Sequence, residues 1–180
     1  MGASRIIASL LAVAVAAAVM LLLAACGEEE HTHVNEGEPI ELGEISYNVA
    51  LTRFLNPEDP EDAEYLEGQP EPQPAEQYLG VFMTVENHGD ATEALPDTFE
   101  VSDTTGATHE ALESESTFAL PLGAEIAAGD EIPAPDTTAA NGPIKGAMVV
   151  FLVPNSVTEN RPLELEIPSS SGDGTVELDI

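Results

Sequence analysis

The sequence predicts an all-β protein, an immunoglobulin-like antiparallel β-sandwich of about seven strands, preceded by a signal-peptide helix. Three observations lead to this fold. Apolar and polar residues alternate over short segments, which is the period of a strand with one buried face. Prolines and glycines separate these segments at short intervals, as they do in sandwiches. No segment of helical period and convincing length follows Cys26.

An apolar leader precedes the predicted sandwich. In residues 6–23 the only polar side chain is Ser9, and the run ends in Leu23-Ala24-Ala25-Cys26. This ending has the form of a bacterial lipobox, in which small residues admit the signal peptidase and the thiol accepts a lipid. We therefore expect residues 1–25 to be a lipoprotein signal peptide and Cys26 to carry the membrane anchor. An uncleaved membrane helix and simple secretion are the two alternatives.

Carboxylates dominate the charge of the chain. Its 180 residues include 34 acidic side chains and four basic ones, for a formal net charge of −30, and cleavage before Cys26 removes Arg5 to give −31. Such a field repels nucleic acid and phospholipid headgroups and attracts cations or basic partners. The sequence therefore predicts no nucleic-acid binding and an unknown, basic protein partner. A saline habitat or resistance to aggregation would explain the same composition.

The length after the leader suits one domain and a spacer. Residues 26–39 contain Val34 as the only sizeable apolar side chain, so we expect a flexible acidic tether there. Residues 40–180 are expected to form the sandwich. Because Cys26 is the only cysteine, its acylation leaves no disulfide, no thiolate nucleophile and no copper site with a cysteine ligand.

Seven segments carry the strand pattern. The first is residues 45–51, in which Ile45, Tyr47, Val49 and Leu51 share the predicted buried face. Residues 78–87 and 147–154 are apolar on both faces, which predicts central strands. The other four, each with one apolar face, are residues 98–102, 108–112, 163–167 and 176–180.

Two longer stretches lack the pattern. Residues 56–77 hold five prolines and eight acids, which predicts an extended and solvated surface loop. The same carboxylates could bind calcium, although the glycine-bearing EF-hand spacing is absent. Residues 113–140 mix apolar side chains with proline and glycine, which predicts irregular chain with one short strand.

Three motifs resemble those of a known family. Residues 78–90 are similar to its first core strand and Asn-x-Gly turn, where Gly89 is expected to take a positive φ. Residues 99–106 are similar to its F-x-L-x-D…G hairpin, and residues 146–154 to its G-x-h-h-F-x-h-P strand, in which h is apolar. The family is the immunoglobulin-like domain of unknown function found in bacterial lipoproteins, related to the small secreted immunogenic protein of mycobacteria.

The resemblance covers residues 39–180. It implies a cell-surface sandwich that takes part in protein interaction and has no catalytic site, and it assigns no functional residue. The chain departs from the family pattern in the acidic insertion at 56–77 and at residues 133–141, where the family has a compact Pro-Gly turn.

Histidine and methionine are the candidate metal ligands. His31 and His33 stand beside three glutamates in the predicted tether and could hold zinc or copper. A copper hypothesis for the sandwich uses a second set of residues: Met83, His88, His109 and Met148. Residues 82–89 are similar to a strand of the periplasmic copper chaperones, but the His-x-Met pair of those proteins is missing. Core packing of the methionines and exposure of the turn histidine explain the same residues without a metal.

Catalytic motifs are absent from the sequence. It contains no Gly-x-Ser-x-Gly elbow and no phosphate-binding glycine loop, and paired carboxylates are too abundant to indicate acid–base chemistry. We therefore expect no enzyme and no cofactor. The sequence favours a non-catalytic binding module, held by the lipid on Cys26 at the extracytoplasmic face of the cell membrane, with an unknown partner-binding surface. The alternative is an extracytoplasmic copper or zinc binding protein.

Overall fold

The structure is a computed structural model, and it describes residues 32–180. The predicted signal peptide, the lipidation residue Cys26 and the candidate ligand His31 lie outside these residues. The described part of the chain forms one compact unit. No helix within residues 32–180 has the length and apolar character needed to span a membrane.

Strands are the main regular structure of the described residues and the helical pieces are short, which confirms the all-β prediction. The strands are β1 (His33–Asn35), β2 (Ile40–Leu42), β3 (Ile45–Leu55), β4 (Glu76–Asn87), β5 (Glu93–Ala94), β6 (Glu100–Ser102), β7 (Thr108–Leu112), β8 (Glu125–Ile126), β9 (Glu131–Ile132), β10 (Ala147–Pro154), β11 (Leu163–Ile167) and β12 (Gly174–Leu178). The helical pieces are α2 (Pro60–Tyr65), α3 (Thr138–Asn141) and the 3-10 turn η1 (Asn155–Glu159).

The expected count of about seven strands is too low. The additional strands β1, β2, β5, β8 and β9 have only two or three residues each. Alternation cannot be read over so short a segment, because one or two side chains define no period. Two of these strands, β8 and β9, lie in residues 113–140, where one short strand was expected.

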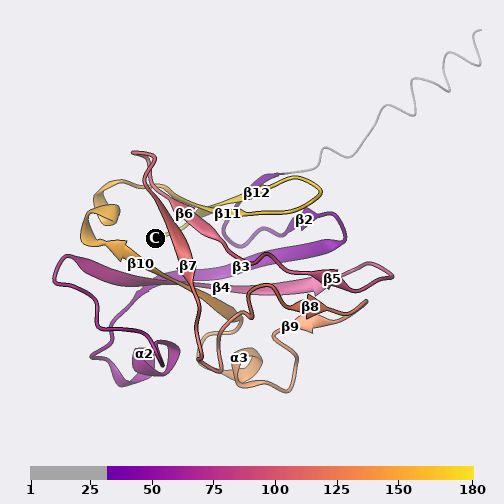
Figure 1. The fold of residues 1–180 in the computed structure, drawn as a ribbon, viewed down its shortest axis with the longest axis horizontal. Helices are drawn as coiled ribbons and strands as arrows, with labels where there is room; N and C mark the ends of the chain where they lie inside the picture. The colour runs from indigo at the N-terminus through magenta and orange to yellow at the C-terminus, as the bar shows by residue number, and fades with distance from the viewer. Residues whose placement is uncertain (1–31) are drawn as a thin grey trace, which may run out of the picture. The chain divides into compact units, whose positions relative to one another are not determined.

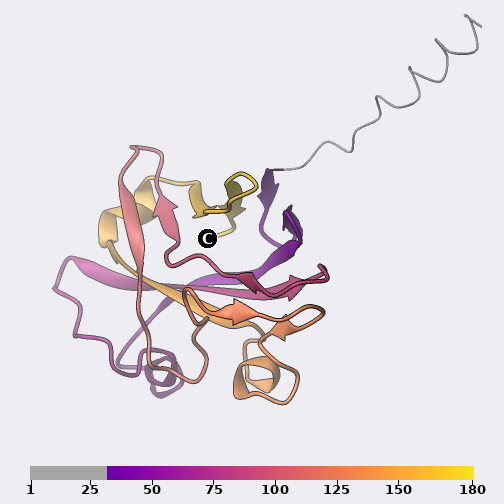
Figure 2. The ribbon, with the colours of Figure 1, turned by 45° about the vertical axis from the view of Figure 1, so that its right-hand side comes forward.

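Ten of the twelve described strands form a sandwich whose two sheets share a strand, and β5 and β8 pair separately. Sheet A has the order β1-β12-β11-β6-β7, and sheet B continues from β7 through β10, β4 and β3 to β2, with β9 also paired to β4. The first part of β7 pairs with β6, and its last two residues pair with β10. All named strand pairs are antiparallel except β1–β12. Figures 1 and 2 show β6, β11 and β12 on one side of β3, β4 and β10, with α2 and α3 on the other side.

Two apolar cores explain why the two longest apolar runs of residues 32–180 are buried on both faces. The first core lies between the sheets and contains Leu79, Val81 and Met83 of β4. The second core covers the outer face of sheet B, where Tyr65 packs edge-on against Phe82 with ring centroids 5.2 Å apart. The prediction that residues 78–87 and 147–154 are central strands is therefore confirmed, since β4 and β10 lie between the two cores.

A β-bulge corrects the predicted face of one residue. The register of β3 against β4 shifts between Val49 and Leu51, so one residue is extra on β3. An extra residue reverses the side-chain alternation of the rest of the strand. Val49 therefore faces the inner core, whereas Leu51 is 36% exposed rather than buried as predicted.

The predicted tether at residues 26–39 is too long, because the fold begins within it. β1 pairs with β12 in parallel, and Val34 is only 6% exposed. The carboxylate of Glu36 accepts a hydrogen bond from Thr52 N in β3 at 3.0 Å and another from Asp179 N at 3.1 Å. Glu36 therefore joins the two sheets at their edge. The small number of apolar side chains does not reveal that this segment is ordered, because backbone pairing of β1 and the carboxylate of Glu36 fix its position.

The prediction of an extended, solvated loop at residues 56–77 is wrong in its first half. Asp59 begins α2 as an N-cap, because its side chain accepts from Glu61 N at 2.9 Å. The helix places Tyr65 and Leu66 in the outer core, with exposures of 3% and 6%. Asp62 is the one buried acid of residues 56–77, Glu76 is half-buried and the other six are exposed.

Candidate functional site

The candidate metal ligands lie on separate elements. His33 is in β1, His88 follows β4 and His109 is in β7. Within residues 32–180 no three His, Cys, Asp or Glu side chains form a group that could hold a metal ion. Met83 and Met148 are fully buried in different cores, on opposite faces of sheet B. The fold therefore does not bring the residues of the copper hypothesis together.

Among the histidines of residues 32–180, His88 is the one that lies beside carboxylates. Its Nε2 lies 3.1 Å from a carboxylate oxygen of Glu86, and its Nδ1 lies 3.8 Å from one of Glu41. The three side chains are about half exposed, between 50% and 56%. In so open a setting these surface contacts contribute little to stability and define no enclosed ligand site.

The Asn-x-Gly motif after β4 builds the turn. Asn87 is 1% exposed, and its Nδ2 donates to Ala91 O at 2.8 Å and to Ile126 O at 3.0 Å. Its Oδ1 accepts from Gly89 N at 2.9 Å. Gly89 does not have the predicted positive φ. Glycine is needed there for space, since a Cβ would lie 2.9 Å from Cβ of Glu44.

The aspartate of the F-x-V-x-D…G hairpin stabilises the loop between β6 and β7. Oδ1 of Asp103 accepts from Thr105 N at 2.8 Å, from Thr105 Oγ1 at 2.6 Å and from Ala107 N at 3.2 Å, and Oδ2 accepts from Asn160 Nδ2 at 3.1 Å. These donors, led by the hydroxyl of Thr105, hold the pKa of Asp103 down at about 2. The motif is therefore structural, as is Gly146 in the third motif, which lies against the backbone of Met83.

Sheet A carries a row of carboxylates on its outer face, which we call the acidic ladder. Its members are Glu100, Glu110, Glu164, Glu166 and Glu177. Glu100 lies directly opposite Glu166 on one neighbouring strand and Glu110 on the other, and Glu164 lies opposite Glu177. The strands of sheet A contain no lysine or arginine. Directly opposed like charges destabilise a sheet, so the ladder lowers the stability of the free protein.

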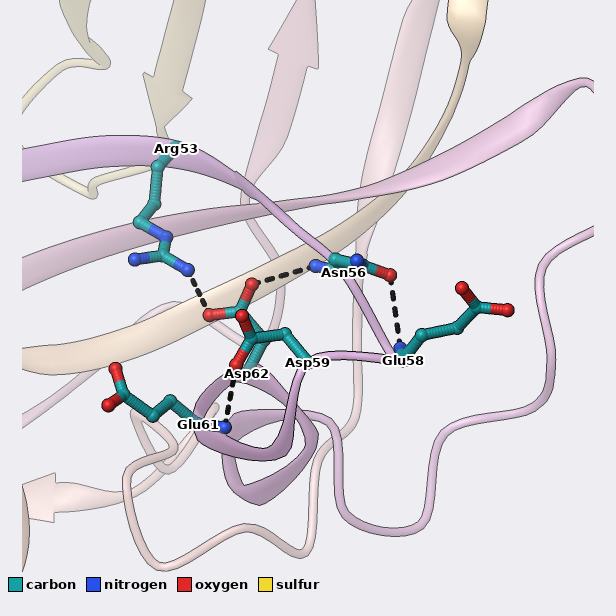
Figure 3. A network of polar contacts seen from close by, with 6 residues as sticks. All are labelled: Arg53, Asn56, Glu58, Asp59, Glu61 and Asp62. Atoms are coloured by element: carbon teal, nitrogen blue, oxygen red, sulfur yellow. Dashed lines mark hydrogen bonds and ion pairs between the residues drawn. The ribbon is translucent and has the colours of Figure 1, made fainter.

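No ion pair joins a lysine or arginine of the described residues to this ladder. Arg53 pairs with Asp62, whose other oxygen accepts from Asn56 N at 2.8 Å (Figure 3). Arg161 donates to backbone carbonyls of Thr158 and Ile180. Asp62 is 4% exposed and ties α2 to the end of β3. Because both oxygens of this buried carboxylate already have partners, Asp62 is not available as a calcium ligand.

A groove of about 620 Å³ lies where β3 ends and β4 begins. Its apolar lining comes from Phe54, Leu55, Pro57, Pro72 and Pro74, and its acidic lining from Glu58, Glu71 and Glu76; three amide side chains complete it, those of Asn56, Gln73 and Gln77. We call it the proline groove. It contains no basic side chain, so its electrostatic preference is for a cation.

The sequence comparisons give no relative. No protein-family model matches the chain, and no curated protein matches it either.

Several solved bacterial structures resemble the fold. An uncharacterized β-sandwich protein from Clostridium difficile 630 has a TM-score of 0.51 and 14% identity, over 85% of this chain and 97% of its own. The protein ycdA of Bacillus subtilis, a candidate lipoprotein, has a TM-score of 0.50 and 13% identity, over 81% of this chain and 39% of its own. The secreted protein MPT63 of Mycobacterium tuberculosis has a TM-score of 0.49 and 13% identity, over 81% and 95%. At these identities the first two comparisons show the fold, a β-sandwich of the kind found in bacteria.

Proposed function

We propose that this protein is a lipid-anchored, extracytoplasmic binding module of immunoglobulin-like fold, without enzymatic activity, whose partner is a basic protein. The observation that carries the proposal is the acidic ladder. Five carboxylates oppose one another on sheet A without a cationic neighbour in its strands. A basic partner would relieve this repulsion on binding and would be steered toward the face by the field.

The immunoglobulin-like character is supported by the two sheets that share β7 and by the three motifs of the sequence. In each motif the signature residue has a structural role: Asn87 in a turn, Asp103 in a hairpin loop and Gly146 at a close backbone approach. The extracytoplasmic location is supported by the lipobox ending at Cys26 and agrees with the secreted and candidate lipoprotein character of two similar structures.

Binding can be tested with the full chain in nanodiscs of uncharged lipid. We expect poly-L-lysine to bind saturably and poly-L-glutamate not to bind. The affinity for polylysine should fall steeply as the salt concentration rises from 0.05 to about 0.5 M, since the charges are exposed. Equal binding of both polymers, or none of either, would refute the proposal.

Anchoring can be tested separately by substitution of Cys26. The wild-type chain should partition with membranes, and its N-terminal peptide should carry the mass of acyl chains. Cys26→Ala should remove this added mass, because alanine has no thiol to acylate. Wild-type chain that starts at Met1 without added lipid would contradict the lipobox interpretation.

A further inference from the structure

We propose that the proline groove is a second binding site of the module, separate from the acidic ladder, and that it takes an extended segment of the partner with alternating basic and apolar side chains. This inference rests on the proposed function and adds a peptide-binding surface to it. The groove is distinct from the acidic ladder, because its lining residues belong to residues 54–77 and none of them lies in sheet A.

The groove combines an apolar surface with an acidic rim. Phe54 is half-buried and packs against the inner core with the rest of its ring available to the groove, and three prolines provide further apolar surface. Glu58 and Glu71 are exposed, and within the described residues their carboxylates form no hydrogen bond or ion pair. Apolar side chains of a ligand would lie on the ring surfaces, and basic side chains would reach the rim.

The wall formed by residues 69–76 is fixed before any ligand arrives. Proline at every second position restricts φ, and the backbone is held at several points. Tyr78 Oη donates to Pro70 O, Gln69 Nε2 donates to Glu113 O at 2.7 Å, and Asn155 N donates to Ala75 O at 2.8 Å. A wall anchored in this way loses little conformational entropy on binding, which favours affinity for a segment of only a few residues.

The groove lies at the end of the sandwich opposite the point where the described chain begins. Thr32 O accepts from Thr175 N, at the start of β12. The groove is next to η1, because Asn155 N donates to Ala75 O. The chain runs from η1 to the start of β11, and the start of β11 lies beside the end of β12. The length of β12, about 17 Å at 3.3 Å per residue, therefore separates the two ends. In Figure 1 the start of β12 lies toward the right, and the gold coil of η1 lies on the left.

The groove is therefore remote from Thr32, where the described chain begins.

The test compares two double variants that remove the same charge. Glu58→Gln/Glu71→Gln neutralises the groove rim, and Glu164→Gln/Glu177→Gln neutralises one opposed pair of the acidic ladder. All four side chains lie outside the cores, so both variants should fold, and circular dichroism checks this. The probe is a fluorescent hexapeptide of alternating lysine and leucine, titrated against the full chain in uncharged nanodiscs at 0.15 M salt. Hexalysine is the charge-only control.

We expect the lysine–leucine peptide to bind the wild type at least tenfold more tightly than hexalysine does. The groove variant should lose about tenfold of this affinity, whereas the ladder variant should change it less than about twofold, since exposed charges beyond a Debye length are screened. If both variants lose the same affinity, or hexalysine binds as tightly, the groove is not the site. Binding of polylysine to the wild type would then still support the proposed function, whereas absence of all cationic binding would remove both.

Discussion

The acidic ladder makes a quantitative prediction about stability. Glu100 is its central residue, because it lies opposite both Glu110 and Glu166. Two carboxylates about 6 Å apart in water repel each other by about 0.7 kcal/mol before screening. With two neighbours, and a Debye length of about 30 Å at 0.01 M salt, the repulsion on Glu100 amounts to about 1.1 kcal/mol. At 1 M salt, where the Debye length is about 3 Å, it falls to about 0.2 kcal/mol.

Glu100→Gln should therefore stabilise the protein, and the gain should depend on salt. We expect the urea midpoint of the full chain in nonionic detergent to rise by about 0.5 M at 0.01 M salt, taking a denaturant slope of about 2 kcal/mol per molar. At 1 M sodium chloride the two midpoints should nearly coincide. Far-UV circular dichroism is a suitable signal, since the chain has three tyrosines and no tryptophan. Urea is required because guanidinium chloride would itself screen the charges.

Glu67→Gln is the matched control. Glu67 is exposed in the turn after α2 and is not opposed by a carboxylate across a strand pair, so its loss should shift the midpoint by less than about 0.2 M. The reasoning is refuted if Glu100→Gln leaves the low-salt midpoint unchanged, or if its effect is the same at both salt concentrations. A gain of equal size in both variants would mean that net charge, rather than the opposed geometry, determines the repulsion.

Three further variants test the structural motifs. Asn87→Ala removes three side-chain hydrogen bonds of a buried residue, so the free energy of unfolding should fall by about 3 kcal/mol in urea titrations; a loss below 1 kcal/mol would contradict this. Gly146→Ala, at φ +125° with a Cβ 2.9 Å from Met83 N, should lose more than about 2 kcal/mol, and normal stability would exclude the close approach. The Asp103 carboxylate has a pKa lowered from 3.8 to about 2 in the folded state, so its stabilisation is present above pH 4 and lost as the pH falls toward 2. Asp103→Asn should thus be less stable than wild type at pH 7, and the difference in midpoint should shrink between pH 4 and 2; a constant difference would refute the assignment.

The candidate site was only partly predictable from the sequence. The acidity of residues 56–77 was evident, and a basic partner was predicted from the net charge of the whole chain. The groove was not evident, because Phe54 and Pro72 line it from segments on either side of α2. The ladder was also hidden, since Glu100 and Glu166 are far apart along the chain and only strand pairing places them opposite each other. The pattern of one-sided strands with outward glutamates is the signal from which such a row could have been suspected.

The sequence by itself determined the sandwich, its long strands and its two central strands, because alternating and doubly apolar segments indicate which side chains are buried. Only the tertiary structure decided what depends on contacts between distant segments: the short strands, the anchoring of residues 33–36, the second core under α2 and the exposure of Leu51. The physical reason is that local pattern encodes burial, whereas registry, bulges and backbone hydrogen bonds depend on the partner segment, which a single strand does not specify.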